Sequence, residues 1–460
     1  MKLRTHLMLL ALATLAAQTS PGAAGTPPAP PERAPETEAH NIATATRFVD
    51  ALGADQFEFA AGQFAPAVQA QLPAEQLRAV WQGFLDQYGA YAQQVAAVAQ
   101  KVRGFDAVVV TCEFAHGALD LTVVFDGAGQ IAGIVAAPAA GSVSAESAPP
   151  PYVQPDRFAE RAVEVHSGDW VLPGTVSMPQ GAGPVSAVVL VHGSGPQDQD
   201  ETIGPNKPFR DLAWGLASAG IAVLRYDKRT YAAPQRAREI QHITAKEEVI
   251  DDAVAALALL RQTPGVDPRR VFLLGHSLGG MLAPRIAQAD PQVAGVIILA
   301  GLTQPLEDTI LDQYTYIASL GGPNGHAAQQ QLDQIQQQVA RAKDPALTPD
   351  TPASELPLGI SASYLLDLRA NMPTAIAKTL PQPMLILRGG TDYQVTAKDT
   401  QGWQDALRGR DDVTFKTYPG LYHLFMPSQA PAHSTPADYT IPGHVAPEVV
   451  DDIATWIKGH

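Results

Sequence analysis

The chain has 460 residues, of which 46% are hydrophobic and 17% are charged. This is the composition of a globular protein, so disorder throughout the chain is excluded, and the length suggests roughly two or three domains. Its 46 acidic against 31 basic side chains give a formal net charge of −15, which argues against a nucleic-acid partner because phosphate binding depends on clustered Lys and Arg. The single cysteine, Cys112, has no partner for an internal disulfide and lies in an apolar run, so we interpret it as a buried structural residue.

Residues 1–25 have the features of a secretory signal peptide. Lys2 and Arg4 provide a positive start, residues 7–17 form an apolar core, and small residues follow it. This core is too short to span a bilayer as a helix, which disfavours the alternative of an uncleaved membrane anchor. No later segment has the length of a membrane span. We therefore expect an exported protein, periplasmic or secreted, whose signal is cleaved.

Two proline-rich stretches delimit a candidate small domain. Residues 26–40 predict a disordered spacer and residues 138–158 predict a second linker. Between them, residues 41–137 begin with apolar side chains at helical spacing and continue with two strand-like runs, 107–114 and 118–125. These features predict an α+β domain.

Asp126-Gly127 follows the second strand-like run, and Asp-Gly is typical of a hairpin turn. The domain has no catalytic spacing of residues. We expect it to bind a ligand or to form a homo-oligomer.

The remaining residues, 159–460, change their pattern. Short, continuous apolar runs alternate with helical segments, which indicates strands buried on both faces of a parallel sheet. The predicted fold is a doubly wound α/β sheet, whose ligands bind at the carboxyl ends of its strands. Residues 302–381 separate two strand candidates and predict a helical cap insertion. The strand candidates are residues 187–191, 221–224, 271–274, 296–300, 384–387 and 413–418.

The segment Gly275-His276-Ser277-Leu278-Gly279 lies between a strand candidate and a helix candidate. This is the nucleophile-elbow pattern in the context that it requires. A serine on so sharp a turn has a strained backbone, and side chains two residues to either side would collide, which explains Gly275 and Gly279. The turn would expose the Ser277 hydroxyl and leave the Leu278 amide at a helix N-terminus, facing any negative charge that develops.

With this motif, the sequence resembles the α/β-hydrolase superfamily and, more narrowly, bacterial carboxylesterases of the esterase D type, which carry a small N-terminal domain. The resemblance covers about residues 160–460. The N-terminal unit is similar to small domains of the nuclear-transport-factor type. The segments that carry the resemblance follow the order of the fold and are residues 191–196, 275–279, 388–395 and 420–423.

Ser277 is the expected nucleophile, and a serine hydroxyl needs a neighbouring base to remove its proton. His423 is the expected base, because it follows a strand candidate in a loop that contains Pro and Gly. His276 lies inside the elbow and should point away from the serine, and His192 should shape its own loop. Two further histidines lie in a Pro-rich stretch and are interpreted as surface residues, His433 and His444.

Asp392 is the expected carboxylate that orients the imidazole. It follows the strand candidate 384–387 after two glycines, at the position that the fold uses for this acid. Asp367 and Asp399 are the alternatives, and both are interpreted as solvated positions on helices.

An oxyanion hole needs two amides directed at the developing charge. Leu278 is expected to supply one, and the resemblance implies that Ser194, in the loop after His192, supplies the other. The acidic run 198–201 is interpreted as a salt-bridged loop in preference to a cation site. The basic run 225–229 is interpreted as a charged structural turn and not as a substrate clamp.

The sequence contains no zinc-helix, phosphate-loop or dinucleotide motif, so no metal or cofactor is implied. The leading hypothesis is a serine hydrolase that cleaves small-molecule carboxylic esters, with short to medium acyl chains, through an acyl-enzyme. A serine peptidase or amidase of the same fold is the first alternative, and a non-catalytic binding protein is the second. Tyr314, Tyr316 and Tyr364 of the insertion could line a pocket, although we expect them to fill the core of the cap.

Overall fold

The computed structural model describes residues 35–460, apart from residues 103–104, 116, 139–148, 182, 322–324 and 431. The expected signal at residues 1–25 lies outside the described residues, as do most of the expected spacer and much of the second linker. The chain divides into two units at the boundary between Ala148 and Pro149, and each unit is described by itself.

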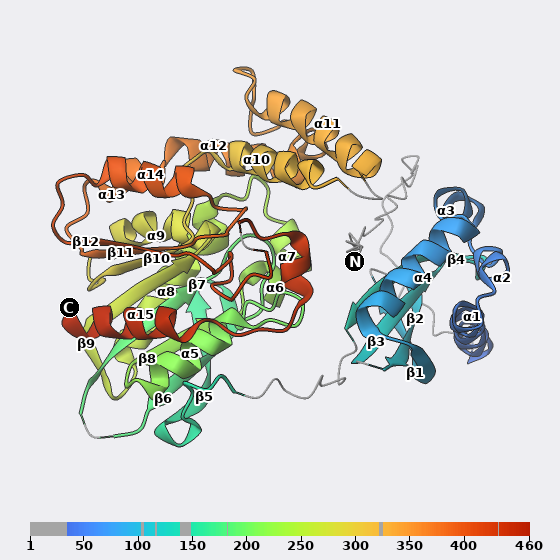
Figure 1. The fold of residues 1–460 in the computed structure, drawn as a ribbon, viewed down its shortest axis with the longest axis horizontal. Helices are drawn as coiled ribbons and strands as arrows, with labels where there is room; N and C mark the ends of the chain where they lie inside the picture. The colour runs from blue at the N-terminus through green and yellow to red at the C-terminus, as the bar shows by residue number, and fades with distance from the viewer. Residues whose placement is uncertain are drawn as a thin grey trace, which may run out of the picture. The chain divides into compact units, whose positions relative to one another are not determined.

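The N-terminal unit consists of helices followed by a four-stranded antiparallel sheet in the order β1-β2-β3-β4 (Figure 1). Asp126 closes the turn between β3 and β4, because its carboxylate accepts hydrogen bonds from the amides of Ala128 and Gln130, both at 2.9 Å. The predicted order of helices and then a meander is confirmed. The elements are α1 (Pro35–Gly53), α2 (Phe57–Ala61), α3 (Pro66–Gln71), α4 (Ala74–Tyr88), β1 (Tyr91–Val102), β2 (Phe105–Phe114), β3 (Gly117–Phe125) and β4 (Ile131–Pro138).

Helix α1 begins at Pro35 and therefore corrects the expectation that residues 26–40 are a disordered spacer throughout. Pro is favoured at the first position of a helix, because its missing N–H would have no partner there and its φ suits the helix. The expectation for Cys112 is confirmed, because its side chain is fully buried in the core between sheet and helices. Burial raises the pKa of its thiol to about 12.

The C-terminal unit contains an eight-stranded sheet in the order β12-β11-β10-β9-β7-β8-β6-β5. The strands from β12 to β8 are parallel, which confirms the predicted doubly wound fold, and β6 and β5 add an antiparallel edge. The strands are β5 (Phe158–Ser167), β6 (Trp170–Pro179), β7 (Val185–Val191), β8 (Ala222–Tyr226), β9 (Val266–His276), β10 (Val296–Leu299), β11 (Met384–Gly389) and β12 (Val413–Tyr418).

Helices cover both faces of this sheet (Figure 1). Helices α5 (Pro208–Ser218) and α15 (Pro447–Gly459) cover one face, and α8 (Asp251–Gln262) and α9 (Leu278–Ala289) cover the other. The shorter elements are η1 (Pro155–Arg157), α6 (Arg229–Ala232), α7 (Pro234–Arg238), η2 (Lys246–Ile250), α14 (Ala397–Ala406) and η5 (Pro436–Thr440).

Between β10 and β11 the chain forms a group of helices at one side of the sheet, labelled α10 to α13 (Figure 1). Tyr364 is buried in the core, as expected, but Tyr316 stacks on Tyr393 with ring centroids 5.0 Å apart. None of the helices described here is long and apolar enough to cross a membrane. The elements of the insertion are α10 (Leu306–Ser319), α11 (Gly325–Ala342), η3 (Ala353–Glu355), η4 (Pro357–Gly359), α12 (Ala362–Ala370) and α13 (Pro373–Ala377).

Candidate active site

Ser277 lies on the sharp turn between β9 and α9, and its backbone is strained. Its φ of 54° and ψ of −116° are values that residues other than glycine rarely adopt. A Cβ atom at Gly279 would lie 2.6 Å from the carbonyl oxygen of His192, and a Cβ atom at Gly275 would lie 2.7 Å from the amide nitrogen of Gly280. Both approaches are too close for any side chain, so the turn requires glycine on either side of Ser277.

His423 and Asp392 form a buried pair at the carboxyl ends of β12 and β11. The Nδ1 atom of His423 lies 2.7 Å from Oδ2 of Asp392, and the two residues are 4% and 2% exposed. The other carboxylate oxygen of Asp392 accepts hydrogen bonds from the amides of Gln394, at 2.7 Å, and Val395, at 3.1 Å. These contacts fix the carboxylate and, through it, the orientation of the imidazole.

The glycines before Asp392 allow its loop to pack against the loop that carries His423. A Cβ atom at Gly389 would lie 2.5 Å from the carbonyl oxygen of Tyr422, and one at Gly390 would lie 2.5 Å from Cα of Pro419. The absence of a Cβ atom at these two positions therefore lets the loops of the acid and the histidine approach each other.

A cavity of about 350 Å³ collects the predicted catalytic side chains. Ser277, His423 and Ser194 all line it, and Asp392 lies behind His423. The structure thus brings together at one edge of the sheet residues that are far apart in the chain. The other residues that line the cavity are Gly193, Gln197, Glu201, Ile203, His276, Tyr393, Gln394, Pro436 and Tyr439.

The loop after β7 lies directly against the nucleophile. A Cβ atom at Gly193 would lie 3.2 Å from Cβ of Ser277. The Gly193 amide is occupied, because it donates a hydrogen bond of 2.6 Å to Oε1 of Glu201. The amides of Ser194 and Leu278 have no acceptor among the residues that the structure describes. Both amides therefore remain available as hydrogen-bond donors.

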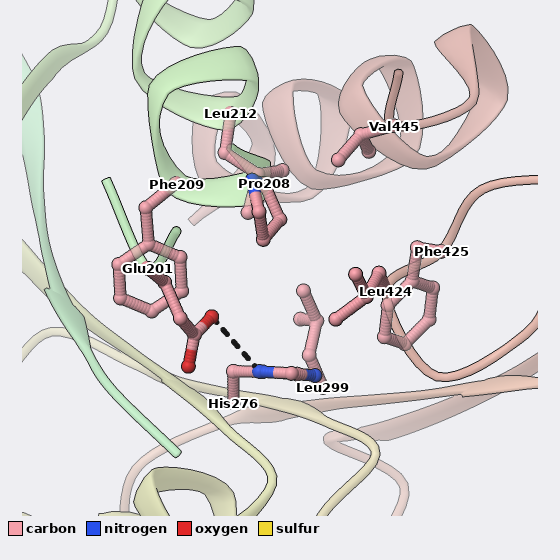
Figure 2. A pocket seen from close by; sticks show the side chains of 9 residues that line it. All are labelled: Glu201, Pro208, Phe209, Leu212, His276, Leu299, Leu424, Phe425 and Val445. Atoms are coloured by element: carbon pink, nitrogen blue, oxygen red, sulfur yellow. Dashed lines mark ion pairs between the residues drawn. The ribbon is translucent and has the colours of Figure 1, made fainter. Parts of the chain in front are cut away.

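A buried Glu–His pair that the sequence analysis did not single out lies under this loop (Figure 2). Oε2 of Glu201 forms an ion pair of 2.9 Å with Nδ1 of His276, and Nε2 of His276 lies 3.0 Å from the carbonyl oxygen of His423. His276 therefore faces Glu201 and the backbone of His423. The expectation that its side chain is directed elsewhere than toward the serine hydroxyl agrees with these contacts.

The charges of this pair depend on one another. Burial opposes ionisation of Glu201, yet the His276 imidazolium and the hydrogen bond from Gly193 hold the pKa of this carboxyl below its usual value. Burial likewise opposes the charge of His276, but the Glu201 carboxylate and the His423 carbonyl raise the pKa of its imidazole. The charged form of each residue thus stabilises the charged form of the other.

His192 and His444 have other partners. His192 is buried against the rings of Phe209 and Tyr226, and burial lowers its pKa to about 4. His444 is half-buried and lies 3.1 Å from Asp211, which corrects its interpretation as a surface residue. Its partner carboxylate is buried, a feature that the Pro-rich sequence does not reveal.

The alternative carboxylates are not solvated helix positions, which corrects the earlier expectation. Asp399 is 1% exposed and accepts a hydrogen bond of 2.8 Å from the amide of Thr303. Asp367 accepts two hydrogen bonds from Arg285, at 2.7 and 2.8 Å. Asp399, on α14, therefore contacts the segment after β10, and Asp367, on α12, contacts α9, so both carboxylates face other elements of the unit and not solvent.

The two charged runs are held by ion pairs, as expected. In the acidic run, Asp200 pairs with Lys207 at 3.0 Å and also with Arg225. In the basic run, Arg229 pairs with the buried Asp252, and Lys228 lies 3.1 Å from Oε1 of Glu248. Lys228 also contacts the loop after β7, a contact that the sequence analysis did not anticipate.

Two family descriptions match this chain. Residues 183–428 match a family described as serine aminopeptidase, S33, and residues 45–134 match one described as a protein of unknown function, DUF3887. Esterase EstD of Thermotoga maritima is 38% identical over 411 residues, which cover 89% of this chain and 93% of that protein.

More distant similarities cover the C-terminal part of the chain. A monoacylglycerol lipase of Mycolicibacterium smegmatis is 24% identical, over 60% of this chain and 89% of that protein. Among solved structures, a dienelactone hydrolase from Anabaena variabilis is 18% identical with a TM-score of 0.40, over 66% of this chain and 99% of that one.

Proposed function

The chain belongs to the α/β-hydrolase family described as serine aminopeptidase, S33, and is a carboxylesterase-type hydrolase, and we propose that it cleaves carboxylic esters through an acyl-enzyme formed on Ser277. One observation carries this proposal. Ser277, on its strained turn, lines the same cavity as His423, whose imidazole is held by Asp392 at 2.7 Å. A serine hydroxyl and a histidine oriented by a carboxylate, in one cavity, are the groups that nucleophilic catalysis by serine uses.

In the proposed first step, the Ser277 hydroxyl attacks the ester carbonyl carbon. Because Nδ1 of His423 is engaged with Asp392, the nitrogen that takes the proton is Nε2. The Asp392 carboxylate stabilises the imidazolium that results, and its hydrogen bonds from two backbone amides keep it in place while it does so. The imidazolium then gives its proton to the departing alkoxide, which leaves as the alcohol.

The carbonyl oxygen becomes an oxyanion during this attack. We assign its stabilisation to the amides of Leu278 and Ser194, which lie beside the nucleophile and have no acceptor among the described residues. Leu278 is the first residue of α9, so the partial positive charge of the helix N-terminus adds to its effect. In the second step, water activated by His423 attacks the acyl-enzyme, and the acid is released.

The cavity favours neutral esters over peptides with a free amino terminus. Glu201 is the only carboxylate among the described residues that line it, and both of its oxygens are occupied, by the Gly193 amide and by His276. An α-ammonium group would therefore find no unpaired carboxylate there. The family description alone supports the second candidate, an aminopeptidase.

We propose acyl chains of short to medium length. The cavity of about 350 Å³ is small for a ligand site, and Ile203, Pro436 and the ring of Tyr393 supply its apolar wall. A series of p-nitrophenyl esters of increasing chain length measures this preference, and kcat/KM should fall for long chains.

The test of the proposed function compares the unaltered protein with Ser277→Ala on p-nitrophenyl butyrate. The variant should lose activity to the level of the uncatalysed background, and mass spectrometry should show an acylated peptide containing Ser277 only in the unaltered protein. Equal rates for the two proteins would refute the acyl-enzyme. Faster turnover of aminoacyl anilides than of esters would favour the peptidase instead.

We also propose that the protein is exported and that the N-terminal unit mediates dimerisation. The first proposal is supported by the character of residues 1–25 alone. Fractionation of cells that express the full chain or a chain lacking these residues tests it, and equal amounts of ester hydrolysis in the periplasm would refute it.

A further inference from the structure

Lys228 is a buried lysine that contacts the loop of the proposed oxyanion hole. Its side chain is 3% exposed, and its Nζ atom donates a hydrogen bond of 3.1 Å to the carbonyl oxygen of Gly193. The same ammonium lies 3.1 Å from Oε1 of Glu248, in η2. Burying an ammonium costs free energy unless it is paired and hydrogen-bonded, so these two contacts are needed to keep Lys228 in this position.

The geometry of the peptide bond connects this contact to the reaction. The carbonyl of Gly193 and the amide N–H of Ser194 belong to one peptide unit, which is planar and trans. The two groups therefore point in opposite directions. By holding the carbonyl on one side, Lys228 directs the Ser194 N–H to the other side, and Ser194 lines the cavity with Ser277.

The preceding peptide unit is held independently. The amide of Gly193 donates to Glu201 at 2.6 Å, while the carbonyl of Gly193 accepts from Lys228. Each of the two peptide units that flank Gly193 is thus hydrogen-bonded to an ionisable side chain. The backbone amide of Lys228 also donates to the carbonyl oxygen of Gln197, at 3.0 Å, which joins the two loops a second time.

We propose that Lys228 is a positioning residue for the oxyanion hole: its ammonium orients the Gly193–Ser194 peptide and polarises it, so that the Ser194 amide is a stronger donor to the oxyanion. This inference rests on the proposed function. The polarisation follows because a cation on a peptide carbonyl draws electron density from the amide of the same unit, as in any chain of linked hydrogen bonds. Lys228 itself does not touch the substrate in this proposal.

Arg229 provides a matched control in the next position of the chain. It is buried like Lys228, and it pairs with a carboxylate on α8, Asp252, through a hydrogen bond of 2.8 Å from its Nε atom. Its guanidinium lies 4.7 Å from the ring of Trp170. These contacts are with β6 and α8, not with the loop after β7.

The experiment measures kcat and KM on p-nitrophenyl butyrate for the unaltered protein, Lys228→Met, Arg229→Met and Ser277→Ala. For Lys228→Met we expect kcat to fall about 10- to 100-fold, less than the roughly 10²- to 10³-fold loss of a whole oxyanion donor, with KM within about twofold. Arg229→Met should lower the melting temperature but keep kcat within about threefold.

An inhibitor supplies a second readout that a purely structural role would not move. A short aliphatic trifluoromethyl ketone accepts the Ser277 oxygen at its carbonyl carbon, the proton passes to His423, and the carbonyl electron pair becomes an oxyanion in the proposed hole. Its affinity for Lys228→Met should fall by the same factor as kcat. If this variant does not fold, Glu248→Gln, which keeps the lysine but removes its partner, should show the same correlation with a smaller loss.

Unchanged kcat in Lys228→Met, or equal losses of kcat in Lys228→Met and Arg229→Met, would overturn the positioning role while an inactive Ser277→Ala still supports the proposed function. Activity in Ser277→Ala would overturn the proposed function itself.

Discussion

His276 is hydrogen-bonded to the backbone of His423: its Nε2 atom lies 3.0 Å from the His423 carbonyl oxygen, and the centroids of the two rings are 4.7 Å apart. The residue that precedes the proposed nucleophile thus holds the residue proposed as its base. Because the other ring nitrogen of His276 pairs with Glu201, and Glu201 also accepts from Gly193, one buried pair connects three loops of the site. The Glu201–His276 pair therefore stabilises the positions of these three loops relative to one another.

Replacing Glu201 with Gln should therefore destabilise the C-terminal unit. The variant keeps an oxygen for the Gly193 amide but leaves the buried His276 without its charge partner, and removal of one partner from a buried pair costs about 3 kcal/mol or more. Urea unfolding at pH 5.5, followed by tryptophan fluorescence, measures the loss. A midpoint equal to that of the unaltered protein would contradict it.

The effect of Glu201→Gln should also depend on pH. The pKa of Glu201 is lowered by folding, so its contribution is present above its ordinary value of 4.5 and is lost as pH falls through the folded pKa. The pKa of His276 is raised, so its contribution is present below its ordinary value of 6.5 and is lost as pH rises through the folded pKa. The difference in unfolding free energy between the two proteins should be largest between about pH 4.5 and 6.5. A difference that grows from pH 6 to pH 9 would disagree with this assignment.

Asp392→Asn should lower kcat by about 10³- to 10⁴-fold with little change in melting temperature, because an amide does not stabilise the imidazolium of His423 and favours the wrong tautomer. Asp399→Asn is the matched control, since Asp399 is also buried after β11 but accepts from Thr303 and not from a histidine. Steady-state kinetics on p-nitrophenyl butyrate compare the two. Retained activity in Asp392→Asn together with lost activity in Asp399→Asn would show that Asp399, and not Asp392, is the carboxylate that catalysis needs.

Gly279→Ala should abolish activity and reduce the yield of folded protein. The added methyl group would lie 2.6 Å from the carbonyl oxygen of His192, which is backbone and cannot move without displacing the loop of the proposed oxyanion hole. Gly420→Ala is its control, because a Cβ atom there has no neighbour within 4 Å although the residue lies only three positions before His423. Ester hydrolysis and circular dichroism of the two variants give the comparison, and an active Gly279→Ala would show that the steric argument fails.

The sequence was sufficient to predict the residues that follow buried strands. Ser277 and Asp392 each lie just after a continuous apolar run, His423 follows the strand candidate 413–418, and parallel strands bring their carboxyl ends to one edge of a sheet. The antiparallel edge strands β5 and β6 were not predicted. In β5 most side chains are exposed and many are polar, so its sequence contains no continuous apolar run.

The contacts of Glu201 and Lys228 could not be predicted for a different reason. Each lies in a charged run that is typical of a solvated loop, and only the packing of three loops buries it. Glu201 has a positive φ of 50°, a backbone conformation that its residue type does not suggest. The signal that could have pointed to it is the histidine inside the elbow, since a buried imidazole needs partners for both nitrogens.

The chain that begins at Pro149 should fold and hydrolyse esters without the N-terminal unit. The two units have separate apolar cores, one built from residues between Ala45 and Ile131 and the other from residues between Val165 and Ile457. Every described residue that lines the cavity belongs to the second. The truncated protein should therefore keep kcat on p-nitrophenyl butyrate within about threefold, while size-exclusion chromatography with light scattering should show the loss of a dimer if the N-terminal unit mediates assembly. An insoluble or inactive 149–460 chain would show that the catalytic unit depends on the other, and an unchanged oligomeric mass would refute the proposed role in dimerisation.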